Sequence, residues 1–127
     1  MSCFRSMSVH EPEVTLRQIV EVCDKAIALR NSTTWEEFRQ DWRKRMLGER
    51  VVEVLGEAVK RLPEDLRARH PQPPWRKIVG TRDYIAHGYD SVDYEVIWGV
   101  LDMEAARLKD AVIAILSAEY PDLPARS

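Results

Sequence analysis

The residues best suited to chemistry lie in one short segment of the chain. It contains an arginine, a carboxylate, an imidazole and a phenol: Arg82, Asp83, His87 and Tyr89. An arginine binds a phosphate through parallel N–H groups, and an imidazole accepts or donates a proton near neutral pH. These side chains could therefore act on one phosphate if the fold brings them together.

Helical geometry places these side chains on two faces. Asp83 and His87 are spaced i, i+4, so the carboxylate could fix the imidazole tautomer. Arg82 and His87 are spaced i, i+5, about 140° apart, and do not share a face. They would meet if Arg82 reached around, if the helix frayed at Gly88, or if a second subunit supplied one of them. A purely structural interpretation stays open, with His87 as a cap, Arg82 as a solvated cation and Tyr89 at the core edge.

Other familiar kinds of catalytic site are not indicated. The three histidines, His10, His70 and His87, do not lie at metal-ligand spacing from another His or Cys. Two cysteines, Cys3 and Cys23, cannot form a disulfide framework, and Cys23 is expected to be a buried hydrophobe. The chain has neither a glycine-rich phosphate loop nor a Gly-x-Ser-x-Gly pattern. We therefore expect no metal site and no cofactor.

The elements that must position these residues are expected to be helices. Apolar residues recur at i, i+3, i+4 and i+7, and no segment alternates in the manner of a strand. The predicted helices span residues 12–30, 34–62, 74–88 and 90–119, with a short extra turn after Pro63. The connector between them, residues 70–74, contains three prolines and His70, which is expected to be exposed. The prediction is an all-α, up-and-down bundle of four to five helices.

The predicted helix over residues 34–62 starts at a capping box formed by Thr34 and Glu37. Its expected buried face consists of Phe38, Trp42, Met46, Leu47, Val51, Leu55, Ala58 and Leu62. Gly48 and Gly56 lie inside it at a cost of about 1 kcal/mol each relative to Ala, which we attribute to close helix packing. Asp90 or Ser91 is expected to cap the last helix, with Asp93 in its first turn.

Composition indicates one globular domain. The 127 residues are 45% hydrophobic and 31% charged, and the expected domain covers residues 12–119, between a flexible leader (1–11) and a flexible tail (120–127). Met7 is an alternative start. The longest apolar run, residues 111–116, is far shorter than the roughly 20 residues that span a bilayer. The N-terminus lacks a signal-peptide core. We expect a soluble, cytoplasmic protein without a membrane partner.

The charge balance hides a basic middle segment. The net charge of −2 argues against a globally basic nucleic-acid binder. Residues 39–82, however, contain 12 Lys and Arg against 6 Asp and Glu. A run of charges is usually a solvated helix face, but such a segment, leading to Arg82, is also what a track for RNA phosphates would need. The candidate RNA-binding residues are Arg43, Lys44, Arg45, Arg76 and Lys77.

The spacing Arg82-x4-His87-x-Tyr89 resembles the Arg-x4-His-x-Tyr motif of HepT-like toxins, members of the HEPN ribonuclease superfamily. Three further blocks resemble family patterns in the same order: a Gly-Glu-Ala helix end (54–63), a Trp-led helix start (74–80), and His-Gly-Tyr, Val-Asp and Trp (87–98). The similarity covers about residues 12–118. Asp83 departs from the family's frequent Asn, and Ala105-Ala106 stands in place of a Leu-Pro step.

This resemblance implies a HEPN-type bundle that forms a homodimer with two motifs facing each other. It implies metal-independent cleavage of RNA, in which the ribose 2′-hydroxyl attacks the adjacent phosphate. His87 would be the general acid or base, Arg82 would hold the phosphate, and Asp83 would orient His87.

The resemblance further implies the toxin of a type VII HepT and minimal nucleotidyltransferase toxin–antitoxin system. The antitoxin would add AMP to Tyr89, which otherwise contacts phosphate, and so block the RNA site. Two alternatives remain at this stage: a non-catalytic HEPN interaction subunit that serves a nucleotidyltransferase, and a helical scaffold without activity.

Overall fold

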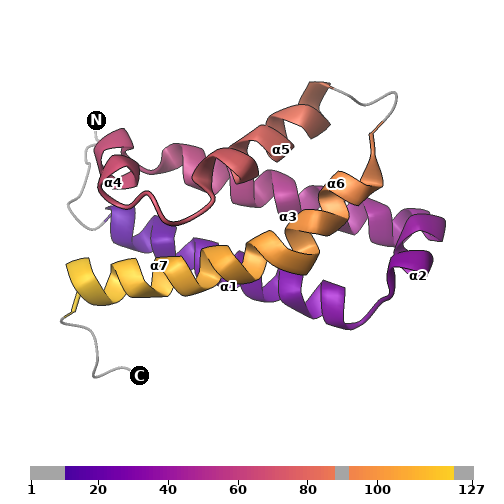
Figure 1. The fold of residues 1–127 in the computed structure, drawn as a ribbon, viewed down its shortest axis with the longest axis horizontal. Coiled ribbons are helices and arrows are strands. Elements are labelled where there is room, and N and C mark those ends of the chain that lie inside the picture. The colour runs from indigo at the N-terminus through magenta and orange to yellow at the C-terminus, as the bar shows by residue number, and fades with distance from the viewer. Residues whose placement is uncertain (1–10, 88–91, 122–127) are drawn as a thin grey trace, which may run out of the picture.

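The computed structural model of the chain describes residues 11–87 and 92–121, and these residues form an all-α bundle (Figure 1). The elements in chain order are α1 (Glu11–Asn31), α2 (Trp35–Gln40), α3 (Trp42–Arg61), α4 (Glu64–Arg69), α5 (Trp75–His87), α6 (Tyr94–Gly99), the π-helical turn η1 (Val100–Glu104) and α7 (Ala105–Glu119). None of the described residues lies in a strand. The predicted fold class is confirmed.

Helix α3 occupies the middle of the arrangement. It packs against α1 on one side and against α5 on the other, and α1 also packs along α7 (Figure 1). Consequently the helix that carries the candidate catalytic residues, α5, takes its position chiefly from α3. No helix among the described residues is long and apolar enough to cross a membrane.

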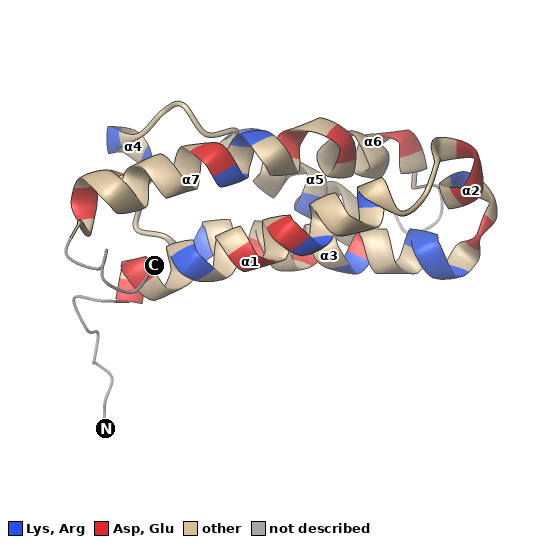
Figure 2. Ribbon diagram, turned by 90° about the horizontal axis from the view of Figure 1, so that it is seen from below, with Lys and Arg blue, Asp and Glu red and all other residues tan. Residues whose placement is uncertain are grey.

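The core is built from the apolar stripes of these helices. Its fully buried side chains include Leu16, Ile19, Phe38, Leu55, Ile78, Ile97 and Leu108. Charged residues of both signs are spread along the outer faces of α1 and α7 (Figure 2). Amphipathic helices with this pattern are stabilised mainly by burial of the apolar stripe.

Glycine at position 48 lets the Phe38 ring enter the core. A Cβ built on Gly48 would lie 2.9 Å from two ring carbons of Phe38, closer than real Cβ atoms approach a neighbour. The prediction that Gly48 and Gly56 serve close packing is confirmed, and the contact at Gly56 is described with the site below.

The prediction of one continuous helix over residues 34–62 is wrong, because the chain breaks at Asp41. The expected capping box of Thr34 and Glu37 does start α2. At Asp41 the backbone is extended (φ −106°, ψ 108°), and its carboxylate accepts a hydrogen bond of 2.9 Å from the amide of Arg43. Asp41 thus ends α2 and caps α3, since it satisfies an amide that has no partner within the new helix.

The break changes which side chains are buried. In one unbroken helix Phe38, Trp42 and Met46 would share a face. After the break Phe38 is fully buried, whereas Trp42, Met46 and Leu47 are 61%, 59% and 52% exposed. Their expected place in the core was therefore wrong, while the rest of the predicted face, from Val51 to Leu62, is buried as expected.

The last predicted helix begins later and is less regular than expected. Asp93 is its N-cap, with the carboxylate accepting from the Glu95 amide at 2.9 Å, rather than a residue of the first turn. The expected caps Asp90 and Ser91 lie outside the described residues. Between α6 and α7 the turn η1 adopts π-helical hydrogen bonding, which inserts one residue into the register.

His70 is less exposed than predicted. Only 20% of its side chain is exposed, and its Nε2 contacts Glu119 at the end of α7. Arg69 also donates to Glu119, from Nε at 3.2 Å and from Nη2 at 2.9 Å. The Trp75 indole donates to the His70 carbonyl at 2.7 Å. These bonds attach the connector before α5 to α7 and so fix where α5 begins.

The predicted flexible leader and tail lie almost entirely outside the described residues. The predicted domain limits, residues 12–119, therefore remain a prediction.

Candidate active site at the end of α5

The Arg82 side chain starts in a gap that Gly56 leaves open on α3. A Cβ built on Gly56 would lie 2.3 Å from Cβ of Arg82 and 2.6 Å from its Cγ. Neither atom is the free end of a flexible chain, so a larger residue at position 56 would push α5 away. The absence of a side chain at Gly56 thus determines how closely Arg82 approaches α3.

Beyond this contact, Arg82 joins a chain of alternating charges that links α3 and α5. Its Nη2 donates to Glu57 and its Nη1 to Asp83, each at 3.3 Å. Asp83 also accepts from Lys60 Nζ at 3.3 Å. The hydrogen bond to Glu57, followed by that to Asp83, raises the pKa of Arg82 above its ordinary value. The bond from Lys60, with that from Arg82, holds the pKa of Asp83 below its ordinary value.

Arg82 nevertheless keeps donors for a ligand. Its side chain is 26% exposed, and the bonds to Glu57 and Asp83 use one donor on each terminal nitrogen. A guanidinium has five N–H groups in a planar fork, so a phosphate oxygen can still be bound.

His87 is the last residue of α5, and its side chain is exposed. Its Nδ1 lies 2.9 Å from the backbone carbonyl oxygen of Asp83. Because a carbonyl oxygen can only accept, Nδ1 must carry the proton in this bond, and Nε2 of a neutral ring then has a free lone pair. Among the described residues no hydrogen bond to Nε2 occurs, so this nitrogen is the candidate proton acceptor.

The expectation that the Asp83 carboxylate orients His87 named the wrong group of Asp83. The residue does fix the ring, but through its carbonyl oxygen, while the carboxylate is engaged by Lys60 and Arg82. The i, i+4 spacing allowed both arrangements. The carboxylate was drawn to α3 by Lys60, a residue whose proximity depends on the packing of α3 against α5.

The structure does not bring Arg82 and His87 together within one chain. Helix α5 is regular through both residues, so the angular separation expected from i, i+5 spacing persists. No hydrogen bond or ion pair within residues 11–87 and 92–121 joins the two side chains. Arg82 turns toward α3, and His87 lies at the exposed helix end.

Tyr84 ties α5 to the start of α6. Its hydroxyl accepts a hydrogen bond of 2.5 Å from the amide of Asp93, the N-cap of α6. Gly88 and Tyr89 lie between these two residues in the sequence and are outside the described residues. The predicted role of Tyr89 remains a prediction.

Comparison with known proteins identifies the family. The profile of the family described as "Ribonuclease HepT-like" matches residues 9–115. The chain is 34% identical to "Putative RNase TTE0752" of Caldanaerobacter subterraneus subsp. tengcongensis, over 85% of this chain and 96% of that protein. It is 31% identical to "Probable ribonuclease HepT" of Thermococcus cleftensis, over 74% of this chain and 86% of that protein. No solved structure matches significantly.

The chain belongs to the HepT-like ribonuclease family. The resemblance to this family inferred from the sequence is confirmed. The linked charges of α3 and α5 and the exposed imidazole are parts of this HepT-like bundle.

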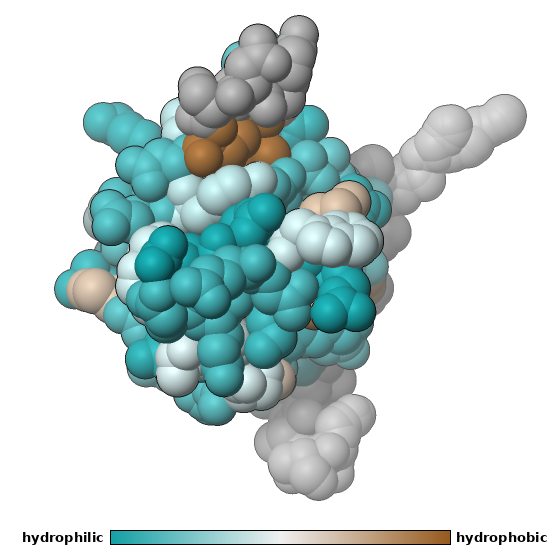
Figure 3. Space-filling model, turned by 90° about the vertical axis from the view of Figure 1, so that its right-hand side faces the viewer, coloured by the Kyte–Doolittle hydropathy of each residue, from teal (hydrophilic) through white to brown (hydrophobic). Residues whose placement is uncertain are grey.

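The basic residues predicted to bind RNA fall into two groups in this HepT-like chain. Arg43, Lys44 and Arg45 lie at the start of α3, where each has a partner: Arg43 bonds Asp41, Lys44 bonds Thr33, and Arg45 bonds the Arg39 carbonyl. The end of the bundle that carries α2 shows a mostly hydrophilic surface (Figure 3). Arg76 and Lys77, in the second group, are exposed on the first turns of α5.

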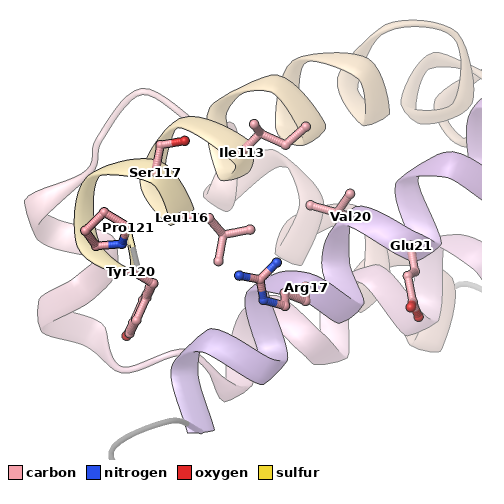
Figure 4. Close-up of a pocket in the computed structure, with 8 residues that line it drawn as sticks. All are labelled: Arg17, Val20, Glu21, Ile113, Leu116, Ser117, Tyr120 and Pro121. Carbon is pink, nitrogen blue, oxygen red and sulfur yellow. The ribbon is translucent and has the colours of Figure 1, made fainter. Parts of the chain in front are cut away.

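Two other places on the HepT-like bundle lack a comparable set of chemical groups. A hollow of about 550 Å³ lies between α1 and α7, where Arg17, Val20 and Leu116 point toward one another (Figure 4). Arg17 there is bound to Glu13 at 3.1 Å.

Cys23 is fully buried as predicted, and burial raises the pKa of its thiol to about 12, so it is no nucleophile at neutral pH. No cluster of metal-ligating side chains occurs among the described residues.

Sequence reasoning missed the residues that hold Arg82 and Asp83 from outside α5. These are Glu57 and Lys60 on α3, next to Gly56, whose close packing was expected but whose partner Arg82 was not. Tyr84, on α5 itself, was missed as the link to the start of α6. The spacing of Glu57 and Lys60, i and i+3 directly after Gly56, places them on one side of α3. That spacing, inside the Gly-Glu-Ala block, was the available signal, but only the packing of α3 against α5 shows which residues it serves.

Proposed function

We propose that this HepT-like chain is a metal-independent endoribonuclease whose Arg82 and His87 act on the scissile phosphate. The observation that carries the proposal is the exposed His87 side chain, whose Nδ1 donates to the Asp83 carbonyl, so that the lone pair of a neutral ring lies on Nε2. Arg82 lies on the same helix and is held by Gly56 and Glu57. The names of the relatives, which designate RNases, support the same activity.

The proposed reaction is transesterification within the RNA. Nε2 of His87 accepts the proton of the ribose 2′-hydroxyl, and the 2′-oxygen bonds to the adjacent phosphorus. The bond to the 5′-oxygen breaks, this oxygen takes a proton from an imidazolium, and a 2′,3′-cyclic phosphate remains. The Arg82 guanidinium stabilises the charge on the equatorial phosphate oxygens. No metal is required because the proton transfers and the charge stabilisation are all performed by side chains.

The geometry of such a displacement favours two copies of the chain. The attacking and leaving oxygens stand roughly in line on opposite sides of phosphorus, so base and acid must approach from opposite sides. Each chain offers one His87 in the motif. We therefore propose a homodimer in which one His87 is the base and its partner copy's imidazole is the acid.

A face of α3 supports this dimer. Trp42 and Met46 are 61% and 59% exposed, and helical spacing puts them on the same face as Glu57 and Lys60. Glu57 and Lys60 bind Arg82 and Asp83. A second copy that covers the apolar side chains would thus lie beside the motif, as the dimeric mechanism requires.

We further propose that the protein is the toxin of a toxin–antitoxin pair whose antitoxin is a small nucleotidyltransferase. The Tyr89 phenol would attack the α-phosphorus of ATP held by the antitoxin, losing its proton and releasing pyrophosphate. The added AMP would place bulk and negative charge two residues from His87, where the RNA phosphate must bind. Mass spectrometry after co-expression with such an enzyme would test this by the mass of AMP on Tyr89.

Purified protein should cleave RNA in the presence of EDTA, and His87→Ala should abolish cleavage. The His87 ring is exposed, so the circular dichroism of the variant should match that of the wild type. Arg107→Ala, at an exposed position on α7, is the control and should cleave normally. Intact RNA after incubation with folded, unmodified wild-type dimer would refute the proposal.

One observation favours a second candidate, a non-catalytic subunit that serves a nucleotidyltransferase. Arg82 is paired with Glu57 and Asp83, as a purely structural arginine would be. The two functions differ in cells: equal growth with wild-type and Arg82→Ala protein, expressed without the partner, would favour the non-catalytic subunit.

A further inference from the structure

A basic groove lies beside the first half of α5. It has a volume of about 790 Å³ and is lined by residues of α4, the proline-rich connector and α5. Its charged lining residues are Arg67, Arg76, Lys77 and Asp83. One wall consists of Pro71, Pro73 and Pro74 around Trp75, which makes it stiff, because proline restricts the backbone.

The cations of this groove have no ionic partner in the part of the chain that the structure describes. Most arginines and lysines of the described chain form ion pairs, but within residues 11–87 and 92–121 no ion pair involves Arg67, Arg76 or Lys77. The Nε of Arg67 is buried and lacks an acceptor among the same residues. The one acidic residue that lines the groove, Asp83, is already bound by Lys60 and Arg82. The groove thus carries uncompensated positive charge.

The groove leads directly to the candidate catalytic histidine. Arg76, Gly80, Asp83 and His87 are spaced i, i+4, i+7 and i+11, so they form one stripe along α5. The stripe is about 16 Å long at 1.5 Å per residue. Gly80, at its middle, has no atom of a neighbouring element within 4 Å of where a Cβ would stand. A polyanion can therefore lie flat along the helix from Arg76 to His87.

We propose that this groove binds the phosphates of single-stranded RNA next to the scissile bond, through Arg67, Arg76 and Lys77. This inference rests on the proposed ribonuclease function and selects one of the two basic groups predicted from the sequence. The residues at the start of α3, Arg43 and Lys44, have acidic or hydroxyl partners and lie at a different end of the bundle. An acidic peptide is disfavoured as the occupant because the stripe ends at the His87 imidazole, which suits proton transfer at a phosphate ester.

RNA binding by full-length His87→Ala protein tests the groove without cleavage of the probe. The probe is a fluorescent single strand of about 20 nucleotides, longer than a single groove site. Arg76 and Lys77 are exposed, so changing both to Ala should leave the fold intact. Loss of two phosphate contacts should reduce the slope of log K against log salt by about 1.4, which corresponds to roughly 25-fold weaker binding at about 0.1 M salt.

A matched variant separates a local site from general charge. Arg107 is an exposed arginine on α7, and Arg107→Ala in the same background should bind as tightly as the parent. Equal affinity of the Arg76/Lys77 variant and the parent, or an equal loss for Arg107→Ala, would overturn the proposal. So would poly-glutamate displacing the RNA at equal charge concentration, since the groove would then be a general polyanion or protein site.

The result is also separable from that of the proposed function. If wild-type protein cleaves RNA but the groove variant binds normally, only the groove proposal fails. If wild-type protein never cleaves RNA, the ribonuclease proposal fails, whatever the binding data show.

Discussion

Arg82 of α5 packs against α3 at Gly56, where the missing side chain leaves space for it. A Cβ on Gly56 would stand 2.3 Å from the Arg82 Cβ, so the two residues fix the distance between α3 and α5 at the motif. Glu57, the next residue on α3, then binds the Arg82 guanidinium. Position and orientation of the arginine thus come from two successive residues of another helix.

Gly56→Ala should destabilise the protein even though alanine is the better helix former. Overpacking against a Cβ attached to the α5 backbone costs up to about 3 kcal/mol, and the gain in helix propensity offsets about 1 kcal/mol. We expect a net loss of about 2 kcal/mol, seen as a Tm lower by roughly 5–10 °C. Gly99→Ala is the matched control, since no neighbouring atom lies within 4 Å of its Cβ position, and its Tm should be equal or higher. A Gly56→Ala protein as stable as the wild type would show that α5 is not held by this contact.

Local signals predicted the helix limits well where a side chain sets them. The capping box at Thr34 and Glu37 begins α2, and Pro63 and the prolines near Trp75 bound α4 and α5. The sequence pattern does not indicate the break at Asp41, because the helical spacing of apolar residues continues through it. An aspartate inside a helical pattern is ambiguous, since the same side chain tolerates a helix or caps a new one.

The candidate site was predictable in its residues but not in its bonds. Arg82 and His87 stand out by type and spacing, and helical geometry already separated their faces. The partners of Arg82 and Asp83 come from α3, so they depend on a tertiary contact at Gly56 that no local pattern reports. For the same reason the bond from His87 to the Asp83 carbonyl, rather than to its carboxylate, emerged only with the fold.

Met46→Glu should weaken the proposed dimer. Met46 is 59% exposed on the face of α3 that also carries Glu57, and a two-fold interface would bury two new charges. The dimer dissociation constant should rise at least tenfold, measured by analytical ultracentrifugation. Met103→Glu, at a methionine 49% exposed on η1, should leave the dissociation constant unchanged. If only the second substitution dissociates the dimer, the copies meet on another face.

Glu119→Gln should lower stability at neutral pH but not in acid. Hydrogen bonds from Arg69 and then His70 hold the pKa of Glu119 below its ordinary value of 4.5. A lowered carboxyl pKa adds stability above about pH 4.5, and this stability is lost as the pH falls through the lowered pKa. The free-energy difference from wild type should be about 1 kcal/mol at pH 7 and should shrink below pH 4 in urea titrations. Glu21→Gln, at an exposed position in α1, should show no such trend; a constant difference for Glu119→Gln would mean that its carboxylate charge is not involved.

Mixed dimers test whether both copies contribute their His87 to one cleavage event. In the proposed mechanism one imidazole is the base and the other the acid, so a dimer with a single His87 lacks one proton transfer worth about 10²–10⁴ in rate. When wild-type and His87→Ala chains exchange at equal concentration, random pairing leaves about one quarter of the dimers with two histidines. Activity should therefore fall to about one quarter of the activity of a sample that contains only wild-type chains at the same total protein concentration. A fall to only one half would show that each His87 acts alone, and Arg107→Ala chains in place of His87→Ala should cause no fall.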